Sequence, residues 1–221
     1  MGKVEAGRYY DIISDPAKRL AHEGDFLLWL LEKAPGPRVL DMACGTGVQA
    51  LFLAEHGARL TARDVDADMI SYARSARPHE SIAYEVADMR GPAGGTFDLA
   101  VVMGNSISML PTSDDVAATL GRIGEMLSPG GVAFVHVINC SLLSSKGPQQ
   151  KVARGNSSGD PVVIVKDMVP AGDSGALVSF SYFQKTAGEW NASGQQGVLL
   201  DLRREFLRKA AVPACLILEG E

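Results

Sequence analysis

The chain has 221 residues, of which 46% are hydrophobic and 21% charged, and its formal net charge is −5 at pH 7. This length suffices for one well-buried domain with a modest extension, and is too short for two large domains. The acidic balance argues against a nucleic-acid backbone as the main partner, because phosphate binding needs a basic surface. No stretch approaches the roughly 20 apolar residues of a membrane span, and the N-terminus lacks the apolar run of a signal peptide.

Cysteine usage points to a reducing compartment. Cys44, Cys140 and Cys215 lie far apart without metal-ligand spacing. An odd number of scattered cysteines is typical of free thiols. We therefore expect a cytoplasmic globular protein that binds no metal, nucleic acid or membrane.

The first two thirds of the chain predict alternating helices and strands. Asp15 and Pro16 favour a helix start, since Asp caps free N–H groups and Pro costs little in the first turn. Leucines at helical spacing extend this helix to residue 33, before a Pro-Gly-Pro segment. We then expect strands at 38–42, 59–63, 82–87, 97–103 and 132–138, and helices at 48–55, from Asp66 onward, and from Ser113 to Leu127. A tight turn at 128–131 launches the fifth strand.

The pattern changes after Cys140. Residues 144–161 are rich in Ser, Gly, Gln and Lys and predict a mobile loop. We then expect antiparallel strands at 162–168, 177–184 and 197–200, a helix at 203–210 and a last strand at 215–218. The predicted fold class is α/β, with a doubly wound, mostly parallel sheet and a small antiparallel excursion after the fifth strand.

A glycine-rich turn follows the first strand. The segment 39–47 reads Val-Leu-Asp-Met-Ala-Cys-Gly-Thr-Gly. Gly45 and Gly47 let the backbone pass close to a ligand at the carboxyl end of the strand, where open α/β sheets bind their ligands. Asp64 ends the second strand, where a carboxylate can accept hydrogen bonds from both ribose hydroxyls of an adenosine. Asp88 ends the third strand and is placed for an adenine amino group. Each feature alone has a simpler explanation, but the set predicts a nucleoside site.

Asp41 indicates which kind of nucleotide is bound. A dinucleotide fold needs Gly-x-Gly-x-x-Gly to bring a helix N-terminus onto a pyrophosphate, and Ala50 at its last position is allowed. Asp41, inside the strand, repels phosphate but can help to hold a cationic amino acid moiety. No Gly-x-x-x-x-Gly-Lys-Ser/Thr segment occurs, so a P-loop is excluded.

Residues 41–47 and 64–69 resemble the first and second motifs of the class I S-adenosylmethionine-dependent methyltransferases. Within that class, the chain resembles the glycine/sarcosine N-methyltransferase group. Shared features are Arg19 ahead of the first motif, the sequence Ala-Cys-Gly-Thr-Gly-Val at 43–48, and the sequence Met-Gly-Asn-Ser at 103–106. The similarity is strong over residues 9–143 and looser over 160–219.

The resemblance implies a role for each matching residue. Arg19, with Tyr9 beside it, would reach the carboxylate of the methionine part of the cofactor, and Asp64 would hold the ribose. The adenine would lie between Val65 and Met69. The full set expected to bind S-adenosylmethionine is Tyr9, Arg19, Ala43, Gly45, Gly47, Asp64, Val65, Met69, Asp88, Met89 and Met103.

Two further residues would face the reacting groups as catalytic residues. They are Asn105 and Tyr182, whose side-chain oxygens could stabilise the positive charge that moves onto the acceptor. Each matching residue also has a structural alternative. Arg19 could be a solvated helix charge, Met69 and Met103 plain core, Asn105 a loop cap and Tyr182 an ordinary sheet tyrosine.

Two departures from the group concern the acceptor and the end of the sheet. The glycine enzymes carry an arginine at the end of strand five that pairs with the substrate carboxylate, and Ile138 stands here instead. Desolvating a carboxylate against isoleucine carries a large penalty. We therefore expect free glycine not to be the substrate, unless Lys151 or Arg154 of the predicted loop moves in. The group also has one more strand after 215–218, which is absent here, so an exposed sheet edge could pair with another chain in a homodimer.

The resemblance divides the chain into four expected parts: an N-terminal helical lid segment (1–37), a cofactor-binding α/β core (38–143), a loop and antiparallel substrate lid (144–200), and a C-terminal helix and strand that complete the core (201–221). The lid would exclude water from the reaction.

The sequence therefore predicts an S-adenosylmethionine-dependent methyltransferase that acts on a small molecule, with an amine as the favoured acceptor. His136 could take the amine proton, although we expect no single indispensable base. Three alternatives remain open. These are an O- or C-methyltransferase, a non-catalytic S-adenosylmethionine-binding domain, and a nicotinamide-dependent reductase, for which no Tyr-x-x-x-Lys pair is found.

Overall fold

The chain folds into two sheets with helices packed around them. The computed structural model describes residues 5–172 and 175–212. Within these residues, a parallel sheet has the strand order β3 (Ile82–Val86), β2 (Arg59–Asp64), β1 (Arg38–Asp41), β4 (Phe97–Val102), β5 (Leu127–Val135). An antiparallel sheet has the order β6 (Gln149–Ser157), β7 (Asp160–Pro170), β8 (Ala176–Thr186), β9 (Glu189–Leu199). This architecture confirms the predicted fold class.

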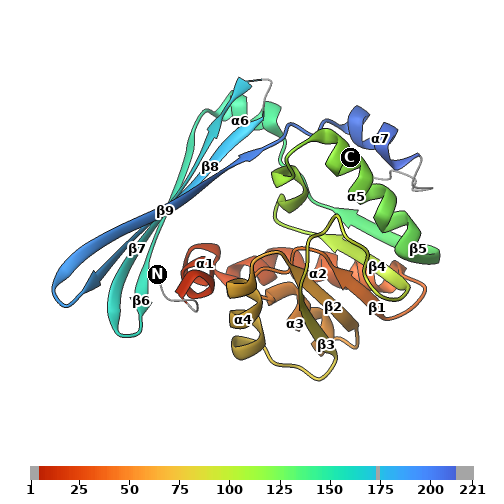
Figure 1. Ribbon diagram of the computed structural model, residues 1–221, viewed down its shortest axis with the longest axis horizontal. Helices are drawn as coiled ribbons and strands as arrows, with labels where there is room; N and C mark the ends of the chain where they lie inside the picture. Colours follow the sequence, from red (N-terminus) through yellow and green to blue (C-terminus); the bar gives the residue numbers. More distant parts are fainter. Residues whose placement is uncertain (1–4, 173–174, 213–221) are drawn as a thin grey trace.

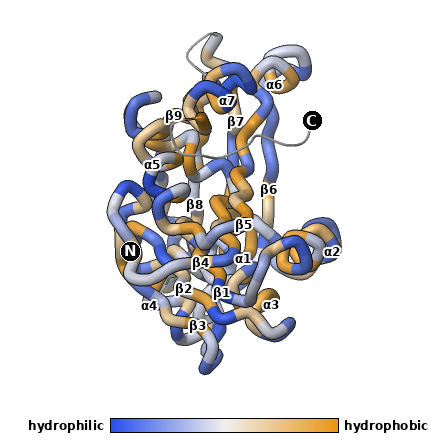
Figure 2. The backbone as a smooth tube through the Cα atoms, turned by 90° about the vertical axis from the view of Figure 1, so that its right-hand side faces the viewer, coloured by the Kyte–Doolittle hydropathy of each residue, from blue (hydrophilic) through white to orange (hydrophobic). Residues whose placement is uncertain are grey.

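Helices cover both faces of the parallel sheet. One face packs against α2 (Pro16–Lys33), α3 (Val48–Glu55) and α4 (Ala67–Ala76), and the other against α5 (Ser113–Met126) and α7 (Arg204–Ala211). Strand β4 is buried at every position, because it lies between β1 and β5 and under helices on both sides. In Figure 2 hydrophobic residues concentrate in the strands of this sheet, whereas both colours alternate along α2.

The predicted boundaries in this half are largely confirmed. Helices α2 and α3 have the expected limits, Asp15 caps α2 by accepting a hydrogen bond from the Lys18 N–H, and Asp66 caps α4. The α5 cap is not Ser113, as expected, but Thr112, whose hydroxyl accepts from the Asp115 N–H at 3.1 Å. Helix α5 ends one residue before Leu127, the expected end.

Strand β5 differs from its prediction. It begins at Leu127, which pairs with Phe97, and ends at Val135 instead of Ile138. The pairing register shifts between Phe97 and Leu99, so the expected turn at 128–131 is an irregularity within the strand. Only the next paired residue, Val132, coincides with the predicted start.

The predicted mobile loop at 144–161 is wrong. Helix α6 (Cys140–Lys146), which Asn139 caps, extends into the first residues of this segment. Strand β6 and the first part of β7 occupy the rest of it. Strand β6 is polar because it lies at the sheet edge, where backbone pairing with β7 holds it without an apolar pattern. For the same reason β9, the other edge strand, is longer than the predicted 197–200.

Two-residue turns join β6 to β7 and β8 to β9. Ser158 and Gly159 between β6 and β7, and Ala187 and Gly188 between β8 and β9, all have positive φ. Such turns match the twist of paired strands. The predicted strands at 162–168 and 177–184 and the helix at 203–210 are confirmed within longer or slightly shifted elements. The strand expected at 215–218 lies outside the described residues.

Helix α1 (Glu5–Ser14), which the sequence analysis did not predict, lies between the two sheets (Figure 1). Its Asp11 carboxylate accepts hydrogen bonds from the Thr46 hydroxyl at 2.7 Å, the Tyr72 hydroxyl at 3.0 Å and the Arg77 guanidinium at 2.7 Å. On its other side, Ile13 packs in a cluster with Ile164. The helix therefore connects the glycine turn to the antiparallel sheet.

Asp98 anchors the start of the parallel sheet, and its removal should lower stability. Its carboxylate accepts from the Arg38 N–H at 3.1 Å, the Arg38 guanidinium at 2.9 and 3.0 Å, and the Ser128 hydroxyl at 2.8 Å. We expect Asp98→Ala to cost about 1–3 kcal/mol, because the Arg38 and Ser128 donors lose the acceptor that they share. Thermal melts at pH 7 measure this cost.

The same ion pair makes an acid-lability prediction. The Arg38 side chain holds the pKa of Asp98 well below its usual range. A carboxyl whose pKa is lower in the folded state stabilises the fold above the unfolded-state pKa and loses this effect as pH falls through the folded pKa. The difference between wild type and Asp98→Ala should therefore shrink in acid. The exposed residue Glu125 supplies the control, since Glu125→Ala should change the melting temperature little; equal effects of the two variants would contradict the assignment.

Candidate active site at the carboxyl edge of the parallel sheet

The glycine turn after β1 requires its glycines. Gly45 and Gly47 have φ of 53° and 80°, a region that side chains disfavour. A Cβ at Gly47 would lie 2.6 Å from the Tyr84 hydroxyl, whereas a Cβ at Gly45 would meet nothing within 4 Å. The turn is thus packed against Tyr84 at Gly47 and has open space beside Gly45. A ligand that approaches the backbone needs such open space.

Asp64, at the end of β2, is joined to this turn. Its carboxylate accepts from the Gly45 N–H at 2.8 Å and from the Asp66 N–H at 3.0 Å. Burial raises its pKa above the ordinary value, and these two N–H groups counteract the rise. A carboxylate has about four acceptor positions, so hydrogen-bonding capacity remains for hydroxyl groups of a ligand.

Asp41 is a second carboxylate at this edge, and it is buried. Burial raises its pKa to about 7, the Ala43 N–H at 3.3 Å lowers it, Asp64 raises it further and Arg19 lowers it. A buried carboxylate that is only partly ionised near neutral pH gains from a nearby cation. The pair Asp41 and Asp64 therefore favours a positively charged ligand.

Arg19 reaches this edge from α2. Its Nε donates to both carboxylate oxygens of Glu23, at 3.1 and 3.2 Å, and Glu23 also accepts from Gln49 at 2.9 Å. A Cβ at Gly104 would lie 3.7 Å from Arg19 Nη2, which places the guanidinium beside the turn after β4. The Arg19 side chain is 17% exposed, so it is mostly withdrawn from solvent, and its role in binding the cofactor stays a prediction. Glu23 and Gln49 were missed by sequence reasoning, because a polar pair on amphipathic helices carries no distinctive pattern.

The residues expected around adenine lie at the ends of β2 and β3. Val65 is 71% exposed, which is unusual for an apolar side chain beside a buried strand, and Met69 is half-buried on the first turn of α4. Met89 packs at the margin of the core cluster under α5. Their positions agree with a sandwich around a flat ring, which stays a prediction.

Asp88 follows β3 but is already engaged. Its carboxylate accepts from the Arg90 N–H at 2.8 Å and from the Arg90 guanidinium at 3.0 and 3.1 Å, and the Arg90 side chain keeps its pKa below the ordinary value. Arg90 also contacts Asp115 at 3.4 Å. An adenine amino group would have to share this carboxylate with Arg90.

Met103 and Asn105 follow β4. Met103 is buried in a hydrophobic core cluster, which agrees with the alternative that it is an ordinary core residue. Asn105 has φ of 68°, and its side chain makes no capping hydrogen bond to η1 (Ser106–Met109). Its Oδ1 is buried without a hydrogen-bond partner within the described residues. A buried unpaired acceptor costs free energy, so this oxygen is suited to a ligand.

Tyr9 and Tyr182 lie elsewhere. Their rings stack at 5.4 Å, 1% and 5% exposed, in the cluster between α1, β7 and β8. The Tyr9 hydroxyl donates to Gln184 at 2.7 Å, and the Tyr182 hydroxyl accepts from Gln195 at 3.1 Å. Burial raises the pKa of Tyr182 to about 12. The structure thus brings the other predicted residues to the carboxyl edge of the parallel sheet, from the strand ends or from helices α2 and α4. It places Tyr9 and Tyr182 under the antiparallel sheet.

His136 lies just beyond β5, where its N–H donates to the Val102 carbonyl at 2.9 Å. Surrounding protein atoms lower the pKa of its ring, Glu23 raises it and Arg19 lowers it. The ring is therefore neutral at pH 7 and can accept a proton.

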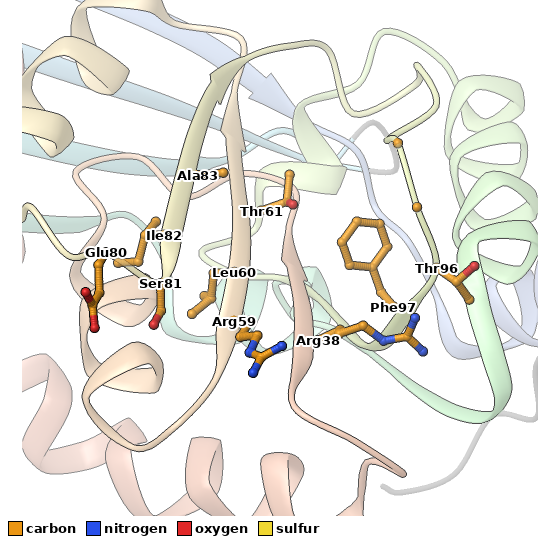
Figure 3. A pocket seen from close by; sticks show the side chains of 12 residues that line it. Arg38, Arg59, Leu60, Thr61, Glu80, Ser81, Ile82, Ala83, Thr96 and Phe97 are labelled. Atoms are coloured by element: carbon orange, nitrogen blue, oxygen red, sulfur yellow. The ribbon is translucent and has the colours of Figure 1, made fainter.

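A separate depression lies at the opposite edge of the sheet. Figure 3 shows residues from the starts of the strands, including Arg38, Arg59, Ile82 and Phe97, around a space of about 640 Å³. Asp41 and Asp64 stand at the other ends of the same strands. The depression is therefore distinct from the candidate site.

Comparisons with known proteins agree with this geometry. A family model described as a methyltransferase domain matches residues 39–131. Glycine N-methyltransferase of Rattus norvegicus is 32% identical over 160 residues, which cover 65% of this chain and 55% of that protein. Magnesium-protoporphyrin O-methyltransferase of Rhodobacter capsulatus is 34% identical over 93 residues, 41% of each chain. The solved sugar N-methyltransferase KedS8 of Streptoalloteichus sp superposes with a TM-score of 0.74 at 21% identity, covering 85% of this chain and 75% of that one.

Residues 39–131 thus match a methyltransferase domain, the fold is that of solved S-adenosylmethionine-dependent methyltransferases, and the chain is distantly similar to the glycine N-methyltransferases. It spans about half the length (55%) of the glycine N-methyltransferase it matches. Within the described residues, no helix is both long and apolar enough to cross a membrane.

Proposed function

We propose that this chain transfers a methyl group from S-adenosylmethionine to a small-molecule acceptor, most favourably an amine. The observation that carries the proposal is the presence of two carboxylates at the glycine turn: Asp64, which is bonded to the Gly45 N–H, and Asp41, which is buried at the end of β1. Open space above Gly45 and the guanidinium of Arg19 complete a site for a nucleoside that bears an amino acid.

The residues present fit S-adenosylmethionine. Arg19 can pair with its carboxylate, Asp64 with its ribose hydroxyls, and Asp41 supports its positive charge. The exposed Val65 and the unpaired Asn105 Oδ1 are an apolar surface and a polar atom that both gain from a ligand. When bound, S-adenosylmethionine supplies a methyl group activated by a sulfonium.

The protein then has three tasks. Arg19 and Asp64 fix the position of one reactant, and orientation of this kind is worth on the order of 7–11 kcal/mol in well-oriented systems. Asn105 Oδ1 offers a fixed acceptor dipole where positive charge moves onto the methyl acceptor. His136, neutral at pH 7, can take a proton from an ammonium so that the amine arrives with a free lone pair.

We further propose that the antiparallel sheet forms the lid over the acceptor. It follows β5 and packs through α1 onto the core (Figure 1). An amine acceptor is favoured because glycine N-methyltransferase and a sugar N-methyltransferase are among the similar proteins. The similar magnesium-protoporphyrin O-methyltransferase makes oxygen acceptors the second candidate.

Calorimetric titration with S-adenosylmethionine and S-adenosylhomocysteine tests the cofactor site directly. An assay of S-adenosylhomocysteine release, with parallel panels of primary amines and of the corresponding alcohols, then tests transfer. Binding with turnover of amines supports the proposal. Turnover of alcohols alone would replace nitrogen by oxygen, binding without any turnover would favour a non-catalytic domain, and absence of binding would overturn the cofactor site.

Asn105→Gly should lower turnover more than cofactor affinity. Glycine retains the positive φ at this position and removes only the side chain. We expect kcat to fall about ten- to a hundredfold, the loss of about 1–3 kcal/mol of transition-state stabilisation, with the Kd for S-adenosylhomocysteine little changed. Ser106→Ala is the matched control, since the Ser106 hydroxyl is already bonded to the Met103 carbonyl. An unchanged kcat in Asn105→Gly would remove Asn105 from the mechanism.

A further inference from the structure

A row of basic and aromatic residues crosses the middle of the antiparallel sheet. Lys151 on β6 lies opposite Lys166 on β7, which in turn lies opposite Phe180 on β8. Alternate residues of a strand share a face, so Ile164 and Tyr182 lie on the same face as this row. Those two residues pack against α1. The row therefore stands on the face of the sheet that is turned toward α1.

Lys166 has no acidic partner within the described residues. Its side chain is half-buried, and its Nζ lies over the ring of Phe180, 5.4 Å from the ring centroid. A cation over an aromatic face is attracted only weakly compared with an ion pair. An ammonium group that is partly withdrawn from water without an acidic partner gains free energy when an anion binds beside it.

Further positive charge gathers around this ammonium group. Burial lowers the pKa of Lys166, and repulsion from Lys151 and from Arg19 lowers it further. Arg19 belongs to the carboxyl edge of the parallel sheet, where it lies beside Gly104. Lys166 is thus within electrostatic reach of Arg19 at the candidate cofactor site.

Residues 135–139, at the end of β5, include no lysine or arginine that could bind an anionic group in place of Lys166. Ile138, where the resemblance led us to expect an arginine, packs at the margin of an apolar cluster with Leu143, Val178 and Leu199. Lys151, expected in a mobile loop, is instead held by β-sheet pairing. The positive charge available to an acceptor therefore comes from the antiparallel sheet.

We propose that Lys166, with Lys151 beside it, binds an anionic group of the methyl acceptor, either a carboxylate or a phosphate ester, while the Phe180 ring contacts the adjoining carbon atoms. This inference rests on the proposed function, because it concerns the acceptor of the same site. A lysine ammonium is a compact point charge that suits either anion without demanding planar geometry. The anion supplies the missing counter-charge for Lys166 and relieves its repulsion from Lys151.

Matched pairs of amines, in which one member carries an anionic group and the other does not, test the proposal. Glycine against glycinamide probes the carboxylate, and 2-aminoethyl phosphate against ethanolamine probes the phosphate ester. Each is titrated calorimetrically into the full chain saturated with S-adenosylhomocysteine, whose own Kd is measured first. We expect at least one acidic member to bind about tenfold or more tightly than its partner without the anionic group, as a charged hydrogen bond of this kind provides.

Variants then identify the cation. Lys166→Met should abolish the preference for the acidic member and leave the Kd for S-adenosylhomocysteine unchanged, and Lys166→Arg should retain part of the preference. Lys185→Met is the matched control, because Lys185 lies on the opposite face of the same sheet by strand alternation. Equal binding of both members of every pair, no binding of any acidic probe, or a preference that survives in Lys166→Met would each overturn the proposal. If the wild type did not bind S-adenosylhomocysteine, the proposed function itself would be refuted.

Discussion

Asp64→Ala should weaken S-adenosylhomocysteine binding about a hundredfold. The carboxylate holds the Gly45 N–H at 2.8 Å and is the acceptor at hand for ribose hydroxyls. Loss of charge-assisted hydrogen bonds worth about 1.5–3 kcal/mol each accounts for such a drop. The substitution also releases the glycine turn, so part of the loss comes from a less ordered backbone. Calorimetric titration at constant pH measures the change.

Two control variants separate these contributions. Asp64→Asn keeps one oxygen that can accept from the Gly45 N–H but loses the charge, and its affinity should fall between those of wild type and Asp64→Ala. Asp66→Ala removes the cap of the neighbouring helix α4 without contacting the turn. It should cost about 1 kcal/mol of stability and leave affinity nearly unchanged. If the Kd of Asp64→Ala matched that of the wild type, the ribose assignment would be wrong.

Asp41→Asn should make the protein more stable and the cofactor site weaker. Asparagine keeps the shape and an acceptor for the Ala43 N–H, but it removes a buried charge. Because burial raises the pKa of Asp41 to about 7 from its unfolded value of 3.8, stability falls as pH rises between these values. At pH 8 the variant should gain about 1–3 kcal/mol, or several degrees in melting temperature. At pH 4 the two proteins should melt alike.

The same change predicts a pH-dependent affinity. A cationic ligand binds the ionised form of Asp41 better, so wild-type affinity for S-adenosylmethionine should rise from pH 6 to pH 8. In Asp41→Asn it should be about tenfold or more lower at pH 8, and flat across this range. Asp66→Asn, which alters a carboxylate that caps α4, should retain the wild-type slope. A flat wild-type profile would contradict the role of Asp41.

The parallel half of the fold could be predicted because its signals are strong and local. Strands buried on both faces give continuous apolar runs, and Asp15, Asp66 and Gly57 mark helix ends by capping and by positive φ. The same logic located the carboxyl edge, since parallel strand ends must meet there. Asp41, Asp64 and Arg19 were found in this way or through family resemblance.

The antiparallel half escaped prediction because its edge strands are exposed. Strand β6 is held by backbone pairing, which any sequence can provide, so Lys151 was expected in a loop. Tyr9 and Tyr182 were expected at the cofactor and the acceptor, yet they stack on each other under this sheet. Whether a residue on such a sheet faces the core depends on register, which turns such as those at Ser158 and Ala187 help to specify.

Helix α1 carries a thermodynamic consequence for the two substrates. Through Asp11 it is bonded to Thr46 in the glycine turn, and through Ile13 it is packed on β7. Under the proposed function, ordering of the glycine turn by S-adenosylmethionine would therefore affect, through α1, the position of the antiparallel sheet that forms the proposed acceptor lid. Such linkage is reciprocal. If S-adenosylmethionine raised the affinity for the acceptor by some factor, the acceptor would raise the affinity for S-adenosylmethionine by the same factor, with α1 as the element that connects the two sites.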